Sequence, residues 1–189
     1  MDFTEQVKYW FFRLVLLVGT DIMGLVVGKL FLWVIASFLP YSMLAVKEFL
    51  ISDMTGSVVA ALTMAGLLAL VFRDDGRKHA AYEDMDLILV TVSAILLLAV
   101  YFIPVIFYNP NDSTRVIDTL YYMYYFPCRW VMIGAGADIK TAVAVGIAVI
   151  LGLELIVYNY KYTTYKKRHP FNFKDPDPEP DEDEAEENA

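Results

Sequence analysis

Charged side chains within or beside long apolar stretches are the residues of this sequence whose types and spacing could do chemistry. Asp21 and Lys29 lie in the first apolar stretch, Asp53 precedes the second, and Glu154 lies in the last. Two carboxylates held close together disfavour the ionisation of one of them, which permits proton exchange. A cation in the same surroundings can bind the phosphate group of a ligand. Which chemistry is possible depends on the elements that position these four residues.

Four apolar stretches carry or flank these charges, and they begin near Trp10, Val58, Leu87 and Ala142. A bilayer core about 30 Å thick is crossed by roughly 20 helical residues, and each stretch reaches that length alone or with its less apolar flank. Backbone groups in lipid require helices or a closed barrel. The stretches lack the alternation of barrel strands. The sequence therefore predicts an all-α membrane protein with four transmembrane helices.

The predicted helices cover about residues 7–38, 42–72, 82–107 and 139–162, within one transmembrane domain of residues 1–170. Pro40 ends the first helix, because proline cannot continue a helix interior. The second helix is expected to end at Phe72, before the charged run at residues 73–79. The last fifteen residues carry nine acidic side chains, which leaves 15 basic and 14 acidic residues in the rest of the chain. Their composition predicts that residues 171–189 form a disordered acidic tail.

The distribution of basic residues predicts the orientation in the membrane, because cytoplasmic flanks are enriched in lysine and arginine. One side of the predicted bundle carries nine basic residues: Lys8, Arg13, Arg73, Arg77, Lys78, Lys161, Lys166, Lys167 and Arg168. The other side carries four: Lys47, Arg115, Arg129 and Lys140. We therefore expect both termini in the cytoplasm of a protein embedded in a membrane.

Helix geometry predicts two polar layers inside the bundle. With Arg13 at the inner boundary, a rise of 1.5 Å per residue places Asp21 roughly 12 Å deep and Lys29 roughly 24 Å deep. With Lys161 and Arg73 at the inner boundary of their helices, the same reasoning places Glu154 near the depth of Asp21, and Asp53 near that of Lys29. Asp21, Asp53 and Glu154 are therefore candidate residues of a polar pathway. The alternatives are hydrogen bonds within the bundle for the first layer, and snorkelling or a structural ion pair for Lys29.

Aromatic residues crowd residues 121–130, between the third and fourth predicted helices. Six of these ten residues are aromatic: Tyr121, Tyr122, Tyr124, Tyr125, Phe126 and Trp130. Tyrosine and tryptophan favour the membrane interface, so this segment is predicted to be a short helix on or in the outer leaflet, ended or kinked by Pro127. It would act either as an aromatic anchor or as a lid over a lipid-headgroup site.

Sequence patterns typical of enzymes are absent. The chain has no glycine-rich phosphate loop, no histidine or cysteine set with metal-ligand spacing, and no Ser/His/Asp arrangement. We therefore expect a protein that is not an enzyme, with no cofactor, metal or nucleic-acid partner. The basic residues Arg13, Arg73 and those at 166–168 are expected to anchor the protein to anionic lipid.

Short motifs in the first two helices resemble those of the GtrA-like family of small four-helix membrane proteins. They are Phe12-Arg-Leu-Val-Leu-Leu-Val-Gly-Thr-Asp, Phe38-Leu-Pro-Tyr and Val71-Phe72-Arg73, so the resemblance covers residues 12–73. The Asn-Arg pair that usually closes the family's second helix is absent, because Leu70-Val-Phe precedes Arg73. The aromatic connection and the acidic tail are further departures from the family pattern.

Members of the GtrA-like family are associated with moving polyprenyl-phosphate-linked sugars across membranes. The resemblance implies a flippase-like, non-enzymatic function and makes Arg13, Lys29 and Arg73 candidate contacts to a lipid phosphate. Because the family is mostly prokaryotic, the resemblance also implies a bacterial plasma membrane. Membrane lipids would be the main partners, with a homodimer or a further membrane protein. An alternative is an accessory subunit of a larger membrane complex, and a third is a proton- or ion-coupled transporter that uses Asp21 and Glu154.

Overall fold

A computed structural model describes residues 3–81, 87–109 and 114–168 of the protein. The predicted acidic tail at 171–189 and the first residues of the third predicted helix lie outside this described part of the chain. Four helical stretches are long and apolar enough to cross a membrane: Trp10–Phe38, Asp53–Ala81, Val90–Phe107 and Ile139–Arg168. The prediction of an all-α membrane protein with four spanning helices is confirmed at this level.

The first spanning stretch is one continuous helical run with a local change of winding. It consists of α1 (Phe3–Leu25), a π-helical turn η1 (Val26–Phe31) and α2 (Leu32–Phe38). Pro40 follows the run in extended conformation, as expected for a residue that cannot continue a helix. A helical hairpin then returns the chain through α3 (Leu44–Ile51).

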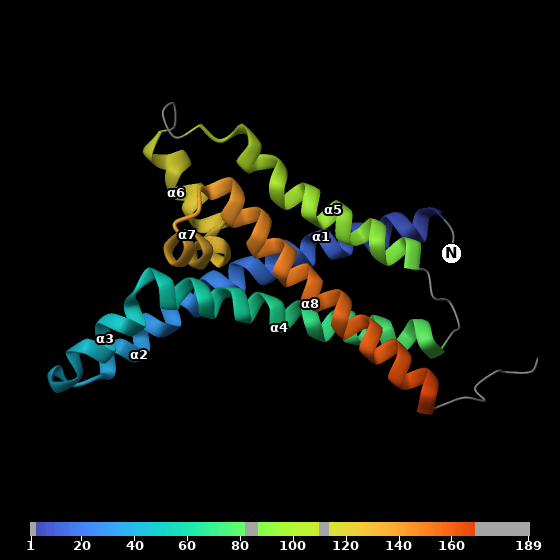
Figure 1. The fold of residues 1–189 in the computed structure, drawn as a ribbon, viewed down its shortest axis with the longest axis horizontal. Helices are drawn as coiled ribbons and strands as arrows, with labels where there is room; N and C mark the ends of the chain where they lie inside the picture. Colours follow the sequence, from blue (N-terminus) through green and yellow to red (C-terminus); the bar gives the residue numbers. More distant parts are fainter. Residues whose placement is uncertain (1–2, 82–86, 110–113, 169–189) are drawn as a thin grey trace, which may run out of the picture.

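The remaining spanning helices are α4 (Asp53–Ala81), α5 (Leu87–Phe107) and α8 (Ile139–Arg168). The short helices α6 (Arg115–Tyr124) and α7 (Arg129–Ala135) connect α5 to α8. Figure 1 shows α1 and α5 running in one direction along the bundle, and α4 and α8 in the other. We call the end where α1 begins and α8 ends the terminal end, and the end with the α2–α3 hairpin, α6 and α7 the hairpin end.

The second predicted helix differs from the structure at both of its ends. The backbone is extended at Ser52, which separates α3 from α4, and the Ser52 hydroxyl accepts a hydrogen bond from the backbone N–H of Thr55 at 3.2 Å. This is the N-cap arrangement that starts a new helix. At the other end α4 continues past Phe72 to Ala81, through a charged run that was expected to break it. The fourth helix likewise continues beyond residue 162, to Arg168.

Helix α4 packs closely against both α1 and α8, and small residues make this possible. A Cβ atom on Gly24 would come 2.8 Å from the carbonyl oxygen of Ala60, and one on Gly28 would collide with Gly56. On the other side of α4, a Cβ on Gly76 would come 2.6 Å from the carbonyl oxygen of Tyr158. The Gly24 and Gly28 pair therefore serves contacts within one chain, as small residues do in membrane helix packing.

The segment 115–135 inserts its middle into the bundle, and we call it the inserted segment. Phe126 and Cys128 are buried at its turn, which is a short 3₁₀ helix containing Pro127. A Cβ on Gly146 of α8 would come 2.7 Å from the Cys128 Sγ atom, so this glycine makes room for the turn. Non-helical backbone at membrane depth is tolerated where protein surrounds it.

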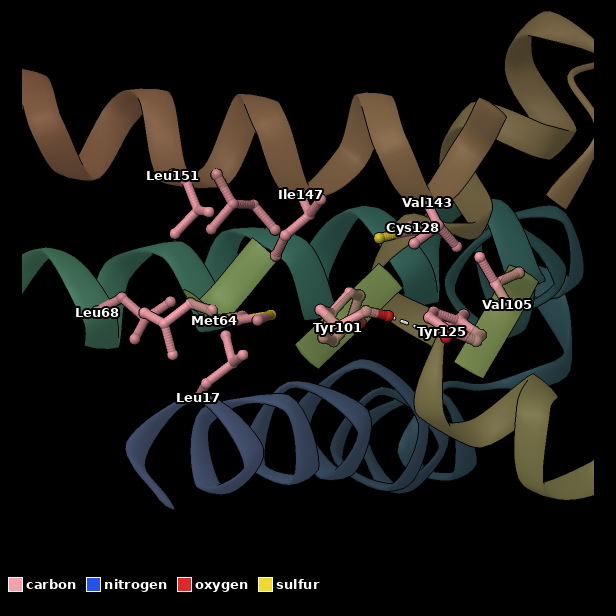
Figure 2. Packing of buried hydrophobic residues seen from close by; sticks show 12 residues of the cluster. Leu17, Met64, Leu68, Tyr101, Val105, Tyr125, Cys128, Val143, Ile147 and Leu151 are labelled. Atoms are coloured by element: carbon pink, nitrogen blue, oxygen red, sulfur yellow. Dashed lines mark hydrogen bonds between the residues drawn. The ribbon is translucent and has the colours of Figure 1, made fainter. Parts of the chain in front are cut away.

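The six aromatic side chains of the inserted segment face the protein rather than its surroundings. Tyr125 and Phe126 are buried, and the other four are half-buried. Figure 2 shows Tyr125 and Cys128 within the main apolar cluster, beside Tyr101 of α5 and Ile147 of α8. The prediction of a helix ended near Pro127 agrees with the structure. Whether the segment lies at the membrane interface stays a prediction.

Candidate functional site

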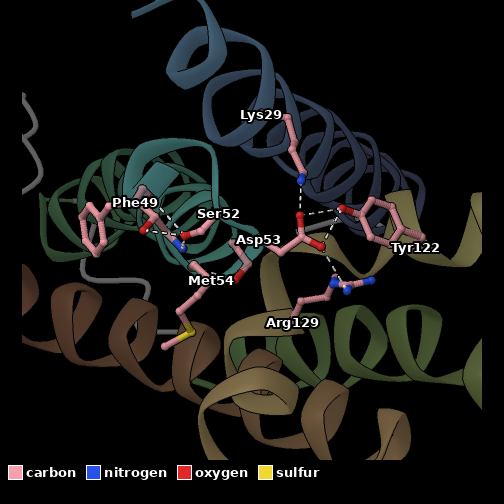
Figure 3. A network of polar contacts seen from close by, with 9 residues as sticks. Lys29, Phe49, Ser52, Asp53, Met54, Tyr122 and Arg129 are labelled. Carbon is pink, nitrogen blue, oxygen red and sulfur yellow. Dashed lines mark hydrogen bonds and ion pairs between the residues drawn. The ribbon is translucent and has the colours of Figure 1, made fainter. Parts of the chain in front are cut away.

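The largest cluster of charged and polar contacts lies at the hairpin end, around Asp53 (Figure 3). Lys29 forms an ion pair with Asp53 Oδ1, and Arg129 Nη2 donates to Asp53 Oδ2 at 3.2 Å. The Tyr122 hydroxyl donates to the same carboxylate, whose oxygens are 3.1 and 3.2 Å away. Two cations thus share one carboxylate, and the cluster carries a net positive charge.

Aromatic rings and an unusual helical turn hold this cluster in place. The Arg129 guanidinium lies 4.1 Å from the centroid of the Tyr122 ring, and Lys29 Nζ lies 5.0 Å from that of Phe126. Lys29 belongs to the π-helical turn η1, a form that occurs frequently at functional sites. An open groove of about 470 Å³ runs beside Lys29, and its lining includes Trp33 and Ile51. The cluster is therefore reached from the surface of the bundle.

Asp21 lies in the middle of the bundle and contacts Tyr101 of α5. Its side chain is buried, and the Tyr101 hydroxyl lies 3.2 Å from Asp21 Oδ1 and 2.9 Å from the carbonyl oxygen of Tyr124. The neighbouring groups of the inserted segment carry no charge near neutral pH. Burial raises the pKa of the Tyr124 hydroxyl and that of the Cys128 thiol to about 12 each. Asp21 is thus surrounded by neutral groups.

Glu154 lies closer to the terminal end than Asp21 does, and it has no hydrogen-bond partner among the described residues. Its exposed fraction is 0%, and neither carboxylate oxygen is satisfied. The contacts of Gly24 with Ala60 and of Gly76 with Tyr158 show which residues of α1 and α8 lie beside which residues of α4. Counting along the helices from these contacts places Asp21 beside residue 63 of α4 and Glu154 beside residue 72. The two carboxylates are therefore roughly 13 Å apart along the bundle axis. The structure does not bring these two carboxylates together.

Arg13 is held inside the bundle by an ion pair with Asp75 of α4. Its side chain is 3% exposed, and its guanidinium lies 5.4 Å from the centroid of the Phe72 ring. Asp75 belongs to the charged run that was expected to end the second helix. The structure therefore uses this predicted break as a partner for a buried cation.

A basic cleft opens between α4 and α8 at the terminal end. Its volume is about 430 Å³, and its lining combines four basic residues with polar, acidic and apolar neighbours: Arg73, Arg77, Lys161, Arg168, Thr164, Tyr165, Asp74 and Leu70. Asp74 pairs with Lys78 at 2.6 Å, so its charge is compensated outside the set of four. We call Arg73, Arg77, Lys161 and Arg168 the basic quartet.

The three predicted phosphate contacts therefore differ in their surroundings. Arg13 and Lys29 each pair with a carboxylate, whereas Arg73 is exposed and lines the basic cleft. Lys29 and Asp53, predicted at one level, do come together. Sequence reasoning gave Arg168 only a role in anchoring to anionic lipid, and it assigned no site role to five other residues: Arg77, Lys161, Arg129, Asp75 and Tyr101. The spacings 73/77 and 161/168 place each pair on one face of its helix, which is the signal that predicts the quartet.

The fold and these sites define a small helical membrane protein with charged groups at three levels of its interior. Within the described ranges, no group of three histidine, cysteine, aspartate or glutamate residues is placed to hold a metal ion. Comparison of the chain with protein-family models, curated proteins and solved structures finds no match. Arguments about its function therefore rest on the charges and their geometry.

Proposed function

We propose that this protein binds the phosphate of a lipid-linked substrate, a polyprenyl-phosphate-linked sugar, and moves it across the membrane without converting it chemically. The terminal end would face the cytoplasm and receive the substrate. The basic cleft between α4 and α8 is the observation that carries this proposal.

The chemistry of the basic quartet suits a lipid phosphate. Arginine presents paired N–H donors that match phosphate oxygens, and Arg73 and Arg77 lie one turn apart on α4. Lys161 and Arg168 line the same cleft from α8. Basic pockets between membrane helices on the cytoplasmic side bind anionic headgroups. Leu70, one turn deeper on α4, would contact the lipid chain.

The interior charges suggest the route that a headgroup would follow. Asp21 lies between the two ends of the bundle, and the cluster of Lys29, Asp53 and Arg129 lies roughly 15 Å farther toward the hairpin end. This cluster retains a net positive charge beside an open groove. It would receive the phosphate after it leaves the basic cleft. The inserted segment would then have to shift, since its turn fills the bundle at this level.

Binding is tested with the full-length protein in nanodiscs, by native mass spectrometry and by titration with a polyprenyl phosphate. Arg73→Ala combined with Arg77→Ala removes two charges from the basic cleft. We expect at least a tenfold loss of affinity, because one charge-assisted hydrogen bond contributes roughly 1.5–3 kcal/mol. Lys167→Ala with Lys166→Ala is the matched control, because it removes two charges from the same end outside the cleft.

Polyprenol without phosphate separates recognition of the charge from recognition of the chain. Equal retention of polyprenol and polyprenyl phosphate by the wild type would contradict the proposal, as would equal losses in the two double variants. Translocation is measured separately in vesicles, by the access of an added glycosidase to a lipid-linked sugar. Tight binding without movement would restrict the function to holding the lipid.

An accessory subunit of a membrane complex is a second candidate, favoured by the α2–α3 hairpin. Phe38 and Tyr41 at its tip are 84% and 93% exposed, and Figure 1 shows the hairpin extending away from the bundle. An exposed apolar surface of this kind marks an interaction site or a lipid contact. Phe38→Ser with Tyr41→Ser would then release a stoichiometric partner during purification and leave polyprenyl phosphate binding unchanged.

A further inference from the structure

Glu154 is the buried ionisable group that the proposed lipid site leaves unexplained. Both of its oxygens lack a hydrogen-bond partner within the described part of the chain, and its side chain is completely covered. A buried carboxylate without donors is costly, so such a group is expected to be neutral or to have a functional partner. Ionisable residues inside membrane helices mark proton or ion pathways by default.

A tyrosine and a histidine lie between Glu154 and the terminal end. Tyr158 follows Glu154 by one helical turn on the same face of α8, and it is also completely buried. The Tyr158 hydroxyl lies 2.8 Å from Nδ1 of His79, in the last turn of α4. His79 is half-buried, so its ring reaches from the interior toward the surface of the terminal end. Histidine is the side chain best suited to shuttle protons near neutral pH.

The charged neighbours of this region are paired or point to other sites. Arg13 of α1 and Asp75 of α4 lie near the level of Glu154 and pair with each other. Lys161, one further turn along α8, lines the basic cleft. Helix α5 presents no charged residue along Val90–Phe107, and its titratable residue facing the interior, Tyr101, contacts Asp21. No cation among these groups forms an ion pair with Glu154 in the described residues.

We propose that Glu154 is a proton-binding site that exchanges its proton with the aqueous phase at the terminal end through Tyr158 and His79. In the outward step the Glu154 O–H bond breaks as its proton moves to the Tyr158 oxygen, while the Tyr158 proton moves to Nδ1 of His79. His79 then releases a proton to water from Nε2. The step requires the Glu154 side chain to rotate toward Tyr158, which lies one helical turn away. The reverse sequence reloads Glu154, and no oxidant or further reactant is required.

This inference does not rest on the lipid substrate, although it would change the charge along the proposed route of the lipid headgroup. A proton-loaded Glu154 is neutral and adds no charge to the bundle, whereas the proton-free form is a buried anion. The two forms therefore differ in the charge that a passing phosphate meets. Exchange with the terminal end would make this charge respond to the pH on that side of the membrane.

Dicyclohexylcarbodiimide tests whether Glu154 carries a proton, because the reagent adds to a protonated carboxyl in apolar surroundings. The proton moves to the reagent nitrogen, a C–O bond forms, and rearrangement leaves a stable N-acylurea. The full-length protein in nanodiscs is labelled across neutral pH, and the modified residue is located by peptide mass spectrometry. We expect labelling at Glu154 that declines as the pH rises, and no label at position 154 in Glu154→Gln. Asp21→Asn is the matched control and should retain the label.

Hydrogen–deuterium exchange of the carboxylic acid C=O infrared band tests the route. The component of the band that is present in the wild type and lost in Glu154→Gln belongs to Glu154. Its exchange should slow about a hundredfold or more in Tyr158→Phe and in His79→Gln, the low end of what a positioned proton-transfer group contributes. The route would be overturned if Glu154 is labelled in the wild type but the exchange rate of its band is unchanged in Tyr158→Phe and in His79→Gln. A wild type without label and without the band would overturn the site.

Three further observations keep these outcomes separate from other failures. Glu154→Gln is expected to remain folded, since it replaces an unsatisfied carboxyl by a neutral group of similar size, and thermal unfolding checks this. Tyr158→Phe retains the ring that packs in the bundle. Polyprenyl phosphate binding is measured in the same samples, so a failed lipid site and a failed proton site are distinguished.

Discussion

Removal of the Asp75 carboxylate is the perturbation whose energetic cost the structure specifies most closely. Asp75→Ala leaves the Arg13 guanidinium inside the bundle without its ion-pair partner. Breaking a buried pair by removal of one partner costs roughly 3–5 kcal/mol, because the remaining charge stays desolvated. The contact of the Phe72 ring with Arg13 is retained in the variant, so it contributes equally to both proteins. We therefore expect a loss of about 3–5 kcal/mol.

Two controls separate this cost from a general effect of the substitution. Arg13→Met with Asp75→Leu removes both charges together and is expected to recover most of the loss, since apolar replacements of a whole buried pair are often neutral or stabilising. Asp74→Ala breaks the neighbouring pair with Lys78, which is more than half exposed. An exposed pair of this spacing contributes at most about 0.5 kcal/mol.

Unfolding is followed by circular dichroism during titration with sodium dodecyl sulfate in mixed micelles. The free energies of the wild type, the two single variants and the double variant are compared at one detergent concentration. Equal stability of Asp75→Ala and Asp74→Ala would refute the reasoning, because it would mean that Arg13 and Asp75 do not form a buried pair. Failure of the double variant to recover stability would show that the cost arises from packing instead.

Two further predictions concern packing and reactivity. Gly28→Leu should prevent the close contact of the first helical run with Gly56 and Ala60 of α4, because backbone atoms cannot move aside. We expect the free energy of unfolding in the same detergent titration to fall by roughly 3 kcal/mol or more. Gly19→Leu, at a position with open space, is the control and should have little effect. Cys128 is 1% exposed and the pKa of its thiol is raised to about 12, so it stays protonated at pH 8. Maleimide should therefore label it only after unfolding, and rapid labelling of the folded protein would contradict the buried position of the inserted segment.

The spanning helices could be predicted from the sequence because their apolar length is a direct consequence of membrane thickness. The level of Lys29 and Asp53 could also be predicted, since each lies on a continuous helical run whose length largely sets its level. The close approach of these two side chains confirms that estimate. Their shared partners Tyr122 and Arg129 could not be predicted, because they come from the inserted segment, whose path depends on tertiary packing.

The extension of α4 beyond Phe72 could not be read from composition. Charged residues are ordinary helix formers, and an isolated glycine such as Gly76 costs about 1 kcal/mol, which close packing offsets. The depth of Glu154 was missed for a related reason. It had been placed relative to Lys161 as a boundary residue, whereas the contact of Gly76 with Tyr158 sets the level of α8. Aromatic content alone does not distinguish a segment facing lipid from one facing protein, as Tyr125 and Phe126 illustrate.

The contacts of Asp21 and of the inserted segment have a consequence for the order in which the helices pair while the chain is being synthesised. Helices α1 and α4 can pair as soon as both have entered the bilayer, because their glycine contacts need no other element. Asp21 receives its hydrogen-bond partner only when Tyr101 of α5 has been inserted. Gly146 of α8, which makes room for Cys128 of the inserted segment, is synthesised later still. Nascent chains that stop after α4 therefore leave Asp21 without its partner in lipid. Membrane chaperones and proteases that survey unassembled helices would meet a degradation signal there, which complete synthesis conceals.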